Sequence, residues 1–159
     1  GLLDGRHANL PWLQEAPDQI SKAVWDSWAE IHPATAAGLG LKDGDYITIT
    51  SDSGAITTRV FLYKGVHPDA IAVPMGRGHT HYGRYATGIG VNPLSLLDGT
   101  ADARTGEFIN TTSVRVHATG DNRHLVRLMD VDSQYGRKLA ATISADQLRR
   151  NQANKQGSA

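Results

Sequence analysis

The sequence predicts a mainly β domain with short helices, of the kind that closes into a β-barrel. Roughly four to six short runs are rich in β-branched and aromatic residues, and one of them, residues 113–118, alternates strictly between polar and apolar side chains. The stretches with helical character are too short for the regular crossovers of a βαβ sheet. With 159 residues, 40% of them hydrophobic and 20% charged, the chain is long enough to bury one proper core.

The chain opens with a long lead, residues 1–24, which is rich in Gly, Pro, Asn and Asp. Leads of this length in compact domains usually bind something or drape over a core. Residues 25–31 mix large apolar with small or polar side chains, which predicts a strand that Pro33 ends. Residues 33–39 predict a short helix with proline in its first turn, and Gly40 is a suitable left-handed terminator.

The clearest β pattern is a hairpin. Residues 46–50 and 55–63 are rich in Thr, Ile and Val, and the turn residues Asp52-Ser53-Gly54 separate them. The other expected elements are strands at 70–75, 113–118 and 124–131, an apolar turn or helix at 94–98, and a helix at 144–156 capped by Ser144. We therefore expect a lead at 1–24, a barrel domain at 25–143, and a terminal helix with a polar tail at 144–159.

Composition excludes several classes of function. Sixteen basic and sixteen acidic residues cancel, which argues against a dedicated nucleic-acid binder. No apolar run approaches the ~20 residues that span a membrane, so we expect no direct membrane insertion. Without cysteine the chain offers no disulfide, no thiolate nucleophile and no cysteine-ligated metal. Because it begins at Gly1 without an initiator methionine, we expect a piece of a longer polypeptide or a processed product.

The most unusual segment is GRGHTHYGRYATGIGVNP, residues 76–93, which follows the expected strand at 70–75. His79 and His81 on an extended backbone would share one face, as two zinc ligands do, but no third ligand stands at a convincing spacing. The chain also lacks the Gly-x-Ser-x-Gly elbow of a nucleophilic serine, and its carboxylates lie in turns and short strands. We therefore expect neither metal ligands nor catalytic residues in this chain.

A phosphate-binding loop is a stronger interpretation of the same segment. Glycine lets backbone N–H groups approach an anion, and arginine offers a fork for phosphate oxygens. The segment combines the two twice, in Gly76-Arg77-Gly78 and in Gly83-Arg84. Tyr82 and Tyr85 are suited to stacking on a heterocycle, and residues 4–9 form a second, weaker Gly/Arg/His/Asn cluster. The pattern matches neither a Walker loop nor a Rossmann fingerprint, so the residues alone leave open a ligand cradle or an ordinary ordered loop.

Four stretches resemble, in this order, parts of the C-terminal dinucleotide-binding domain of the molybdopterin oxidoreductases, the dimethyl sulfoxide reductase superfamily. They are DGRHANLPWLQE (4–15), WAEIHPATAAGLGLKDGDYITITSDSGAITTRV (28–60), GVHPDAIAVPMGRGHTHYGRYATGIGVNPLSLLD (65–98) and TTSVRVHATG (111–120). In the second stretch His-Pro, Gly-Asp and Ser-x-x-Gly fall at the family's spacing. The glycine-rich loop of the third is most similar to the branch that contains polysulfide and thiosulfate reductases and related quinone-linked complexes.

The resemblance implies a double-psi β-barrel, also called an aspartate-decarboxylase-like barrel, that forms one domain of a larger catalytic subunit. Such a domain helps to bind a molybdopterin guanine dinucleotide cofactor that carries molybdenum or tungsten, together with other domains of that subunit. It positions the cofactor for two-electron redox chemistry such as the reduction of sulfur compounds, and it is inactive as an isolated fragment. The alternative is a cofactor-less structural homologue in a membrane quinone-linked electron-transfer complex.

The same resemblance implies partners and a location. The expected partners are the other domains of the parent subunit, an iron–sulfur subunit and a membrane anchor subunit. The expected location is a periplasm-facing, membrane-associated complex. Nucleic acid is not an expected partner.

The resemblance also carries over to individual positions. Gly5 and Arg6 stand where the family's first loop meets the pterin and its phosphates, with His7 and Asn9 beside them. Most relatives have Thr where this chain has Asp4, which puts hydroxyl-based contacts there in doubt. In the second loop the candidates are Asn92, where the family has a cofactor-contacting asparagine, and, from position and chemistry, His79, Tyr82, Gly83 and Arg84. We hypothesise that loops 5–9 and 76–92 converge on one pole of the barrel and bind pterin and phosphate.

Overall fold

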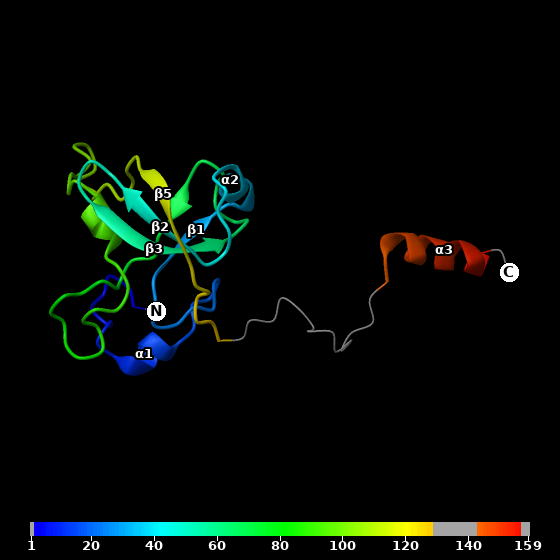
Figure 1. Ribbon diagram of the computed structural model, residues 1–159, viewed down its shortest axis with the longest axis horizontal. Helices are drawn as coiled ribbons and strands as arrows, with labels where there is room; N and C mark the ends of the chain where they lie inside the picture. The colour runs from blue at the N-terminus through cyan, green and yellow to red at the C-terminus, as the bar shows by residue number, and fades with distance from the viewer. Residues whose placement is uncertain (1, 129–142, 157–159) are drawn as a thin grey trace. The chain divides into compact units, whose positions relative to one another are not determined.

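The computed structural model describes residues 2–128 and 143–156. It is mainly β sheet with a few short helices, as the sequence predicts (Figure 1). The elements are α1 Pro11–Glu15, β1 Trp28–Ile31, α2 Pro33–Gly38, β2 Asp45–Thr50, β3 Ala55–Leu62, β4 Ile71–Ala72, the 3₁₀ helix η1 Pro93–Leu96, β5 Arg115–Asn122 and α3 Ala145–Gln156. The chain divides into two compact units, Gly1–Met129 and Asp130–Ala159, so α3 belongs to a different unit from the sheet.

The five strands form one sheet in the order β4-β1-β3-β2-β5. Strands β2 and β3 are the predicted hairpin and pair antiparallel, with Thr48 opposite Thr57. Strand β1 runs parallel to β3, while β4 and β5 pair antiparallel to β1 and β2. Strands β4 and β5 are therefore the two edges, and within the described residues the sheet is open.

Alternation along the strands places two apolar clusters on opposite faces of the sheet. The larger cluster contains Ala29 and Ile31 of β1 and Val60 of β3, together with Ala36 of α2, Leu41, Ile47, Ile49, Ile56 and Leu96. The smaller one contains Trp28 and Phe61, which occupy the intervening strand positions, with Ala23 and Leu125. The larger cluster joins α2 and η1 to the sheet, so it fixes the point at which the glycine-rich loop returns to the core.

Local chemistry explains the elements that were predicted well. Helix α2 begins at a proline, and His32 caps it, since its Nδ1 accepts a hydrogen bond from the N–H of Ala34 at 3.2 Å. Gly40, at φ +68°, follows the helix. Helix α3 has the predicted cap. The Ser144 hydroxyl accepts from the N–H of Gln147 at 3.2 Å, while the Gln147 side chain accepts from the N–H of Ser144 at 2.9 Å.

Two predicted strands are shorter than expected. The strand expected at 70–75 pairs only over Ile71–Ala72, since Pro74 lacks the N–H that would continue the ladder. The strand expected from residue 25 begins at Trp28. Trp25 has φ +54°, which is incompatible with an extended strand.

Two further expectations need correction. The strand expected at 124–131 does not form over residues 124–128, which make a single isolated bridge between Arg127 and Ala23, and residues 129–131 lie outside the described part. The lead at 1–24 is not wholly irregular, because it contains α1. The strand expected at 113–118 does form, shifted to Arg115–Asn122, with a bulge in its pairing with β2.

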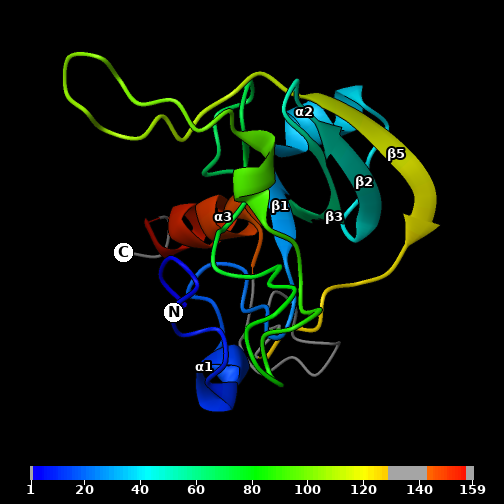
Figure 2. The same ribbon diagram turned by 90° about the vertical axis from the view of Figure 1, so that its left-hand side faces the viewer.

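The segment between η1 and β5 extends away from the sheet (Figure 2). A bridge between Ala101 and Phe108 closes it on itself, and Phe108 and Ile109 are exposed. None of the helices in the described ranges combines the length and hydrophobicity needed to cross a membrane.

Candidate functional site

The two glycine-rich segments of the sequence, residues 4–9 and 76–92, lie side by side, as both ribbon views show (Figures 1 and 2). The Tyr82 hydroxyl donates a hydrogen bond to the carbonyl of Arg6 at 2.9 Å. The N–H of Tyr85 donates to the side-chain oxygen of Asn9, also at 2.9 Å. These contacts join residues 76 positions apart in the chain, so the predicted convergence of the two loops is confirmed.

Glycine is required where the loops meet. Gly5 has φ +104°, and a Cβ there would lie 2.7 Å from Nε2 of His79. The His79 ring stacks on Tyr82 with 4.8 Å between ring centroids. Gly83 has φ +84°, and a Cβ there would overlap the side-chain amide of Asn9. Each loop therefore has a glycine against a polar side chain of the other.

The loop 76–92 is also folded back on itself. The N–H of Gly78 donates to the carbonyl of Ile89 at 2.8 Å, and the N–H of Gly88 donates to the carbonyl of His79 at 2.9 Å. The N–H of Val91 donates to the Ser27 hydroxyl at 3.0 Å, just before β1. The loop is therefore an ordered structure fastened to the sheet, rather than a plain solvated connection.

The two exposed arginines of the candidate site differ in their partners. Arg6 forms an ion pair with Asp4, with 2.7 Å between Nη2 and Oδ2, and its side chain is 67% exposed. The side-chain hydrogen bond from Arg6 is the main reason that the pKa of Asp4 is lowered far below its usual value. A lowered carboxyl pKa keeps this pair intact at neutral pH, and it is lost only as the pH falls into the acid range.

Arg84 is the exposed arginine that remains available to a ligand. Its guanidinium lies 5.5 Å from the centre of the Tyr85 ring, and it makes no ion pair in the part of the chain that the structure describes. The N–H groups of Gly83 and Arg84 likewise have no acceptor among residues 2–128 and 143–156. An exposed guanidinium in the same turn of chain as two consecutive N–H groups of this kind offers the donors that an anion needs.

Arg77, in contrast, is turned inward. Its Nε donates to the side-chain oxygen of Gln14 at 3.0 Å, and its guanidinium lies 5.9 Å from the centre of the Trp28 ring. Burial lowers the pKa of Arg77, an effect that Asp26 and Asp18 oppose. The Gly-Arg-Gly pattern at 76–78 is thus not a second free phosphate fork. Sequence reasoning missed Gln14 entirely.

The remaining candidate residues contribute differently. Asn92 is exposed, and its side-chain oxygen accepts from the N–H of Leu94 at 3.1 Å, which caps η1. Its amide nitrogen makes no hydrogen bond within the part of the chain that the structure describes, because only the oxygen is used in the cap. His7 is half-buried, and its carbonyl accepts from the N–H of Leu10 in the turn that precedes α1.

His79 and His81, which we considered as metal ligands on the sequence alone, lie in two different environments. His79 stacks on Tyr82, and its Nε2 is buried without a hydrogen-bond partner in the described residues. His81 is exposed, and its Nδ1 forms a hydrogen bond with the hydroxyl of Thr80 at 3.0 Å. Among the described residues no three His, Asp or Glu side chains gather as metal ligands do.

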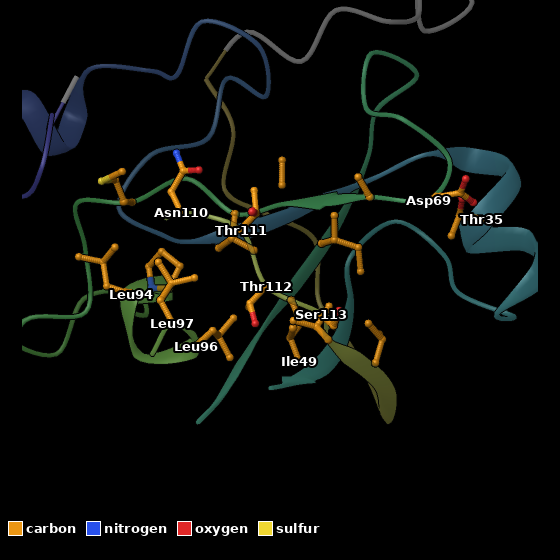
Figure 3. Close-up of a pocket in the computed structure, with 18 of the residues that line it drawn as sticks. Thr35, Ile49, Asp69, Leu94, Leu96, Leu97, Asn110, Thr111, Thr112 and Ser113 are labelled. Carbon is orange, nitrogen blue, oxygen red and sulfur yellow. The ribbon is translucent and has the colours of Figure 1, made fainter. Parts of the chain in front are cut away.

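A separate groove of about 880 Å³ lies along the edges of the sheet (Figure 3). Most of its walls come from three segments, namely residues 68–75, η1 with the residue that follows it, and residues 110–116, and Thr35 and Ile49 complete the lining. Apolar side chains such as Ile49, Leu94 and Leu96 point into it beside Thr111 and Thr112. None of the nine candidate cofactor residues lines this groove, so the groove and the converging loops are distinct features.

A family model described as "Molydopterin dinucleotide binding domain" matches residues 8–113. The chain belongs to this family. The match covers β1 to β4 and the whole loop 76–92 with its residues His79, Tyr82, Gly83, Arg84 and Asn92, and it ends just before β5. It begins within the first loop, just before Asn9. The resemblance to the dinucleotide-binding domain of the molybdopterin oxidoreductases is therefore confirmed.

The curated relatives of this chain include subunits named as molybdopterin-containing and one subunit named as molybdopterin-binding-like. The chain is 41% identical over 92 residues to the arsenate respiratory reductase molybdopterin-containing subunit of Shewanella sp. (strain ANA-3), a match that covers 57% of this chain. It is 33% identical over 81 residues, 51% of its length, to the menaquinone reductase, molybdopterin-binding-like subunit of Nitratidesulfovibrio vulgaris. It is 29% identical over 96 residues, 60% of its length, to the thiosulfate reductase molybdopterin-containing subunit of Salmonella typhimurium. These matches cover only 11%, 12% and 13% of the relatives' own lengths.

Proposed function

We propose that this chain is the cofactor-binding domain of a larger molybdenum or tungsten oxidoreductase subunit, in which it holds molybdopterin guanine dinucleotide. The observation that carries the proposal is the convergence of loops 4–9 and 76–92, two ordered glycine-rich segments of which the second carries the exposed Arg84. The proposal is supported by the family of the chain, which binds a molybdopterin dinucleotide.

The residues of the two loops fit a phosphate-bearing heterocycle. Arg84 and the N–H groups of Gly83 and Arg84 offer positive charge and donors without competing acceptors in the described residues. Nε2 of His79 is a buried polar atom with no hydrogen-bond partner among residues 2–128 and 143–156, and an unsatisfied buried polar atom of this kind calls for an explanation such as a bound group. Tyr82 offers an aromatic face at 42% exposure.

Within this proposal the two loops have complementary roles. Gly5, Arg6, His7 and Asn9 form one wall of the site, and His79, Tyr82, Gly83, Arg84 and Asn92 form the other. The bound cofactor supplies the two-electron redox chemistry. The residues of this chain bind the dinucleotide, orient it and limit the access of water, while none of them acts as a catalytic group.

The parent subunit completes the fold and the site. We propose that the sheet belongs to a double-psi β-barrel domain at 25–143, preceded by a cofactor-facing lead at 1–24 and followed by a helix and polar tail at 144–159. The apolar groove between the segments 68–75 and 110–116 supports a sheet that closes further in the parent. The other domains of the subunit would supply the rest of the cofactor site, including the metal ligand.

The proposed activity of the parent is the reduction of sulfur compounds or of a related oxyanion. Its support is the similarity to subunits named for thiosulfate and arsenate reductases. An iron–sulfur subunit and a membrane anchor subunit, in a periplasm-facing complex, complete the proposed assembly. The relative named as a menaquinone reductase subunit is consistent with electron exchange with a quinone.

Metal and nucleotide analysis of the native parent subunit tests the proposed function. We expect about one molybdenum or tungsten atom per subunit and guanine nucleotide after acid hydrolysis, in proportion to the metal. The protein should be purified from its own source without chelators, since a heterologous host without the cofactor pathway yields the empty form. Active native protein with neither metal nor guanine nucleotide would contradict the proposal and favour the cofactor-less homologue.

A further inference from the structure

We infer that Gln14 and Arg77 are positioning residues that hold the two cofactor loops in their binding arrangement. The inference rests on the proposed function, because it assumes that the loops bind the dinucleotide. It goes beyond that function by assigning the preorganisation of the site to the buried Gln14 and the half-buried Arg77, which do not themselves belong to the candidate contact surface.

Gln14 is a fully buried polar side chain at the meeting point of both loops. It lies on α1, is 0% exposed, and its amide nitrogen donates to the carbonyl of Ala8 at 2.8 Å. The same nitrogen reaches the carbonyl of Tyr85 at 3.5 Å, and its oxygen accepts from Arg77 at 3.0 Å. One amide therefore contacts the end of the first loop and two points of the second.

Arg77 extends this connection through the second loop. Its guanidinium lies over Trp28 of β1, so the side chain is held against the sheet. Gly90, at φ +65°, packs so closely that a Cβ there would lie 3.0 Å from Cβ of Arg77. Arg77 thus links the beginning of loop 76–92 to its end, to Gln14 and to the sheet.

At neutral pH the amide of Gln14 satisfies both partners, which neither an ionised carboxylate nor a hydrocarbon can do. A carboxylate would accept from Arg77 but would face the carbonyl of Ala8 without a proton to donate. A hydrocarbon would remove the buried donor to the Ala8 carbonyl and the acceptor of the half-buried Arg77 Nε. In either case the two loops would sample open arrangements, and the apparent affinity for the cofactor would fall with the fraction of competent molecules.

The test uses the purified, loaded parent subunit with the substitutions Gln14→Leu, Arg77→Ala and the double variant. Metal and guanine nucleotide that remain bound are measured over time at a fixed temperature, alongside the melting temperature. Ile49→Val is the matched control, since Ile49 is buried in the sheet core and contacts neither loop segment in the pairing that the structure records. We expect each single variant to lose cofactor roughly tenfold faster or more. The double variant should be no faster than the faster single variant, because both changes break one connection.

A purely structural role predicts a different pattern. Cofactor loss would then follow the melting temperature alone, and Ile49→Val would fall on the same line as the loop variants; that result would overturn the inference. The inference would also be overturned if the wild-type protein is loaded and the variants release cofactor at the wild-type rate. That result would leave the proposed function intact. Wild-type parent without cofactor would instead contradict the proposed function.

Gln14→Glu keeps the test decisive if the larger changes prevent folding. At neutral pH its carboxylate should speed cofactor loss, because it repels the carbonyl of Ala8. As the pH falls and the carboxyl gains a proton, its O–H can donate to that carbonyl, and retention relative to wild type at the same pH should recover. The nearby Asp18 and Asp26 are common to both proteins, so the comparison cancels their titration. Retention that is equal to wild type at neutral pH would contradict the assigned role.

Discussion

Gly78→Ala in the parent subunit is expected to yield protein with less than about one tenth of the wild-type cofactor content. Gly78 has φ +83°, and a Cβ there would overlap the backbone nitrogen of Asn92 and the carbonyl carbon of Val91. Backbone atoms cannot rotate away as a flexible side chain can, so the two ends of the loop 76–92 must separate. A displacement that costs more than about 1.4 kcal/mol already reduces the population of the binding arrangement tenfold.

Gly88→Ala is the matched control for this prediction. Gly88 lies in the same loop with φ +76°, but a Cβ there would meet nothing within 4 Å. Both substitutions therefore share the cost of a left-handed alanine, about 1–2 kcal/mol, and only Gly78→Ala adds the overlap. Metal and guanine nucleotide per subunit are the measurement. Equal occupancy of the two variants would show that closure of the loop does not control binding.

Arg84→Ala should weaken cofactor binding by about ten- to a hundredfold. The guanidinium is exposed, and a charge-assisted hydrogen bond to phosphate is worth about 1.5–3 kcal/mol. Arg84→Lys keeps the charge but loses the planar fork, so its effect should be intermediate. Because the side chain is exposed, the melting temperature of the cofactor-free protein should change little.

Arg104→Ala provides the control for a general loss of positive charge. Arg104 is also exposed, and it lies in the segment between η1 and β5, outside both cofactor loops. Its replacement should leave cofactor content at the wild-type level. Retention by Arg84→Ala equal to that of Arg104→Ala would exclude Arg84 from the cofactor site.

The elements that the sequence predicts well are those set by local chemistry. The hairpin of β2 and β3 has its turn residues in place, and Ser51 closes the turn by accepting from the N–H groups of Ser53 and Gly54. The late start of β1 has a tertiary cause. The N–H of Trp25 donates to the carbonyl of Gln14 at 3.2 Å, and its indole donates to Glu15 at 3.1 Å, so contacts with α1 hold it in a left-handed conformation.

In the candidate site, too, features set by local chemistry were predictable and features set by distant contacts were not. Glycine and arginine at 76–84 marked the loop because their chemistry is visible in the sequence itself, and the family resemblance paired it with residues 4–9. The inward turn of Arg77 was not predictable, since its partner Gln14 lies 63 positions away and a lone glutamine in a short helix carries no pattern. Asn92 caps η1, which is a structural role. Its position in the sequence alone does not tell whether an asparagine there caps a helix or contacts a ligand.

Hydrogen–deuterium exchange of the parent subunit, with and without its cofactor, tests most directly whether the two loops bind it. The cofactor-free form can be made in a host that lacks the cofactor pathway. We expect the amides of residues 4–9 and 76–92 to exchange roughly tenfold more slowly or more in the loaded protein. Residues 110–116, which line the separate apolar groove, should exchange equally in both forms. Protection confined to 110–116, with both loops unchanged, would contradict the assignment of the cofactor site to the converging loops.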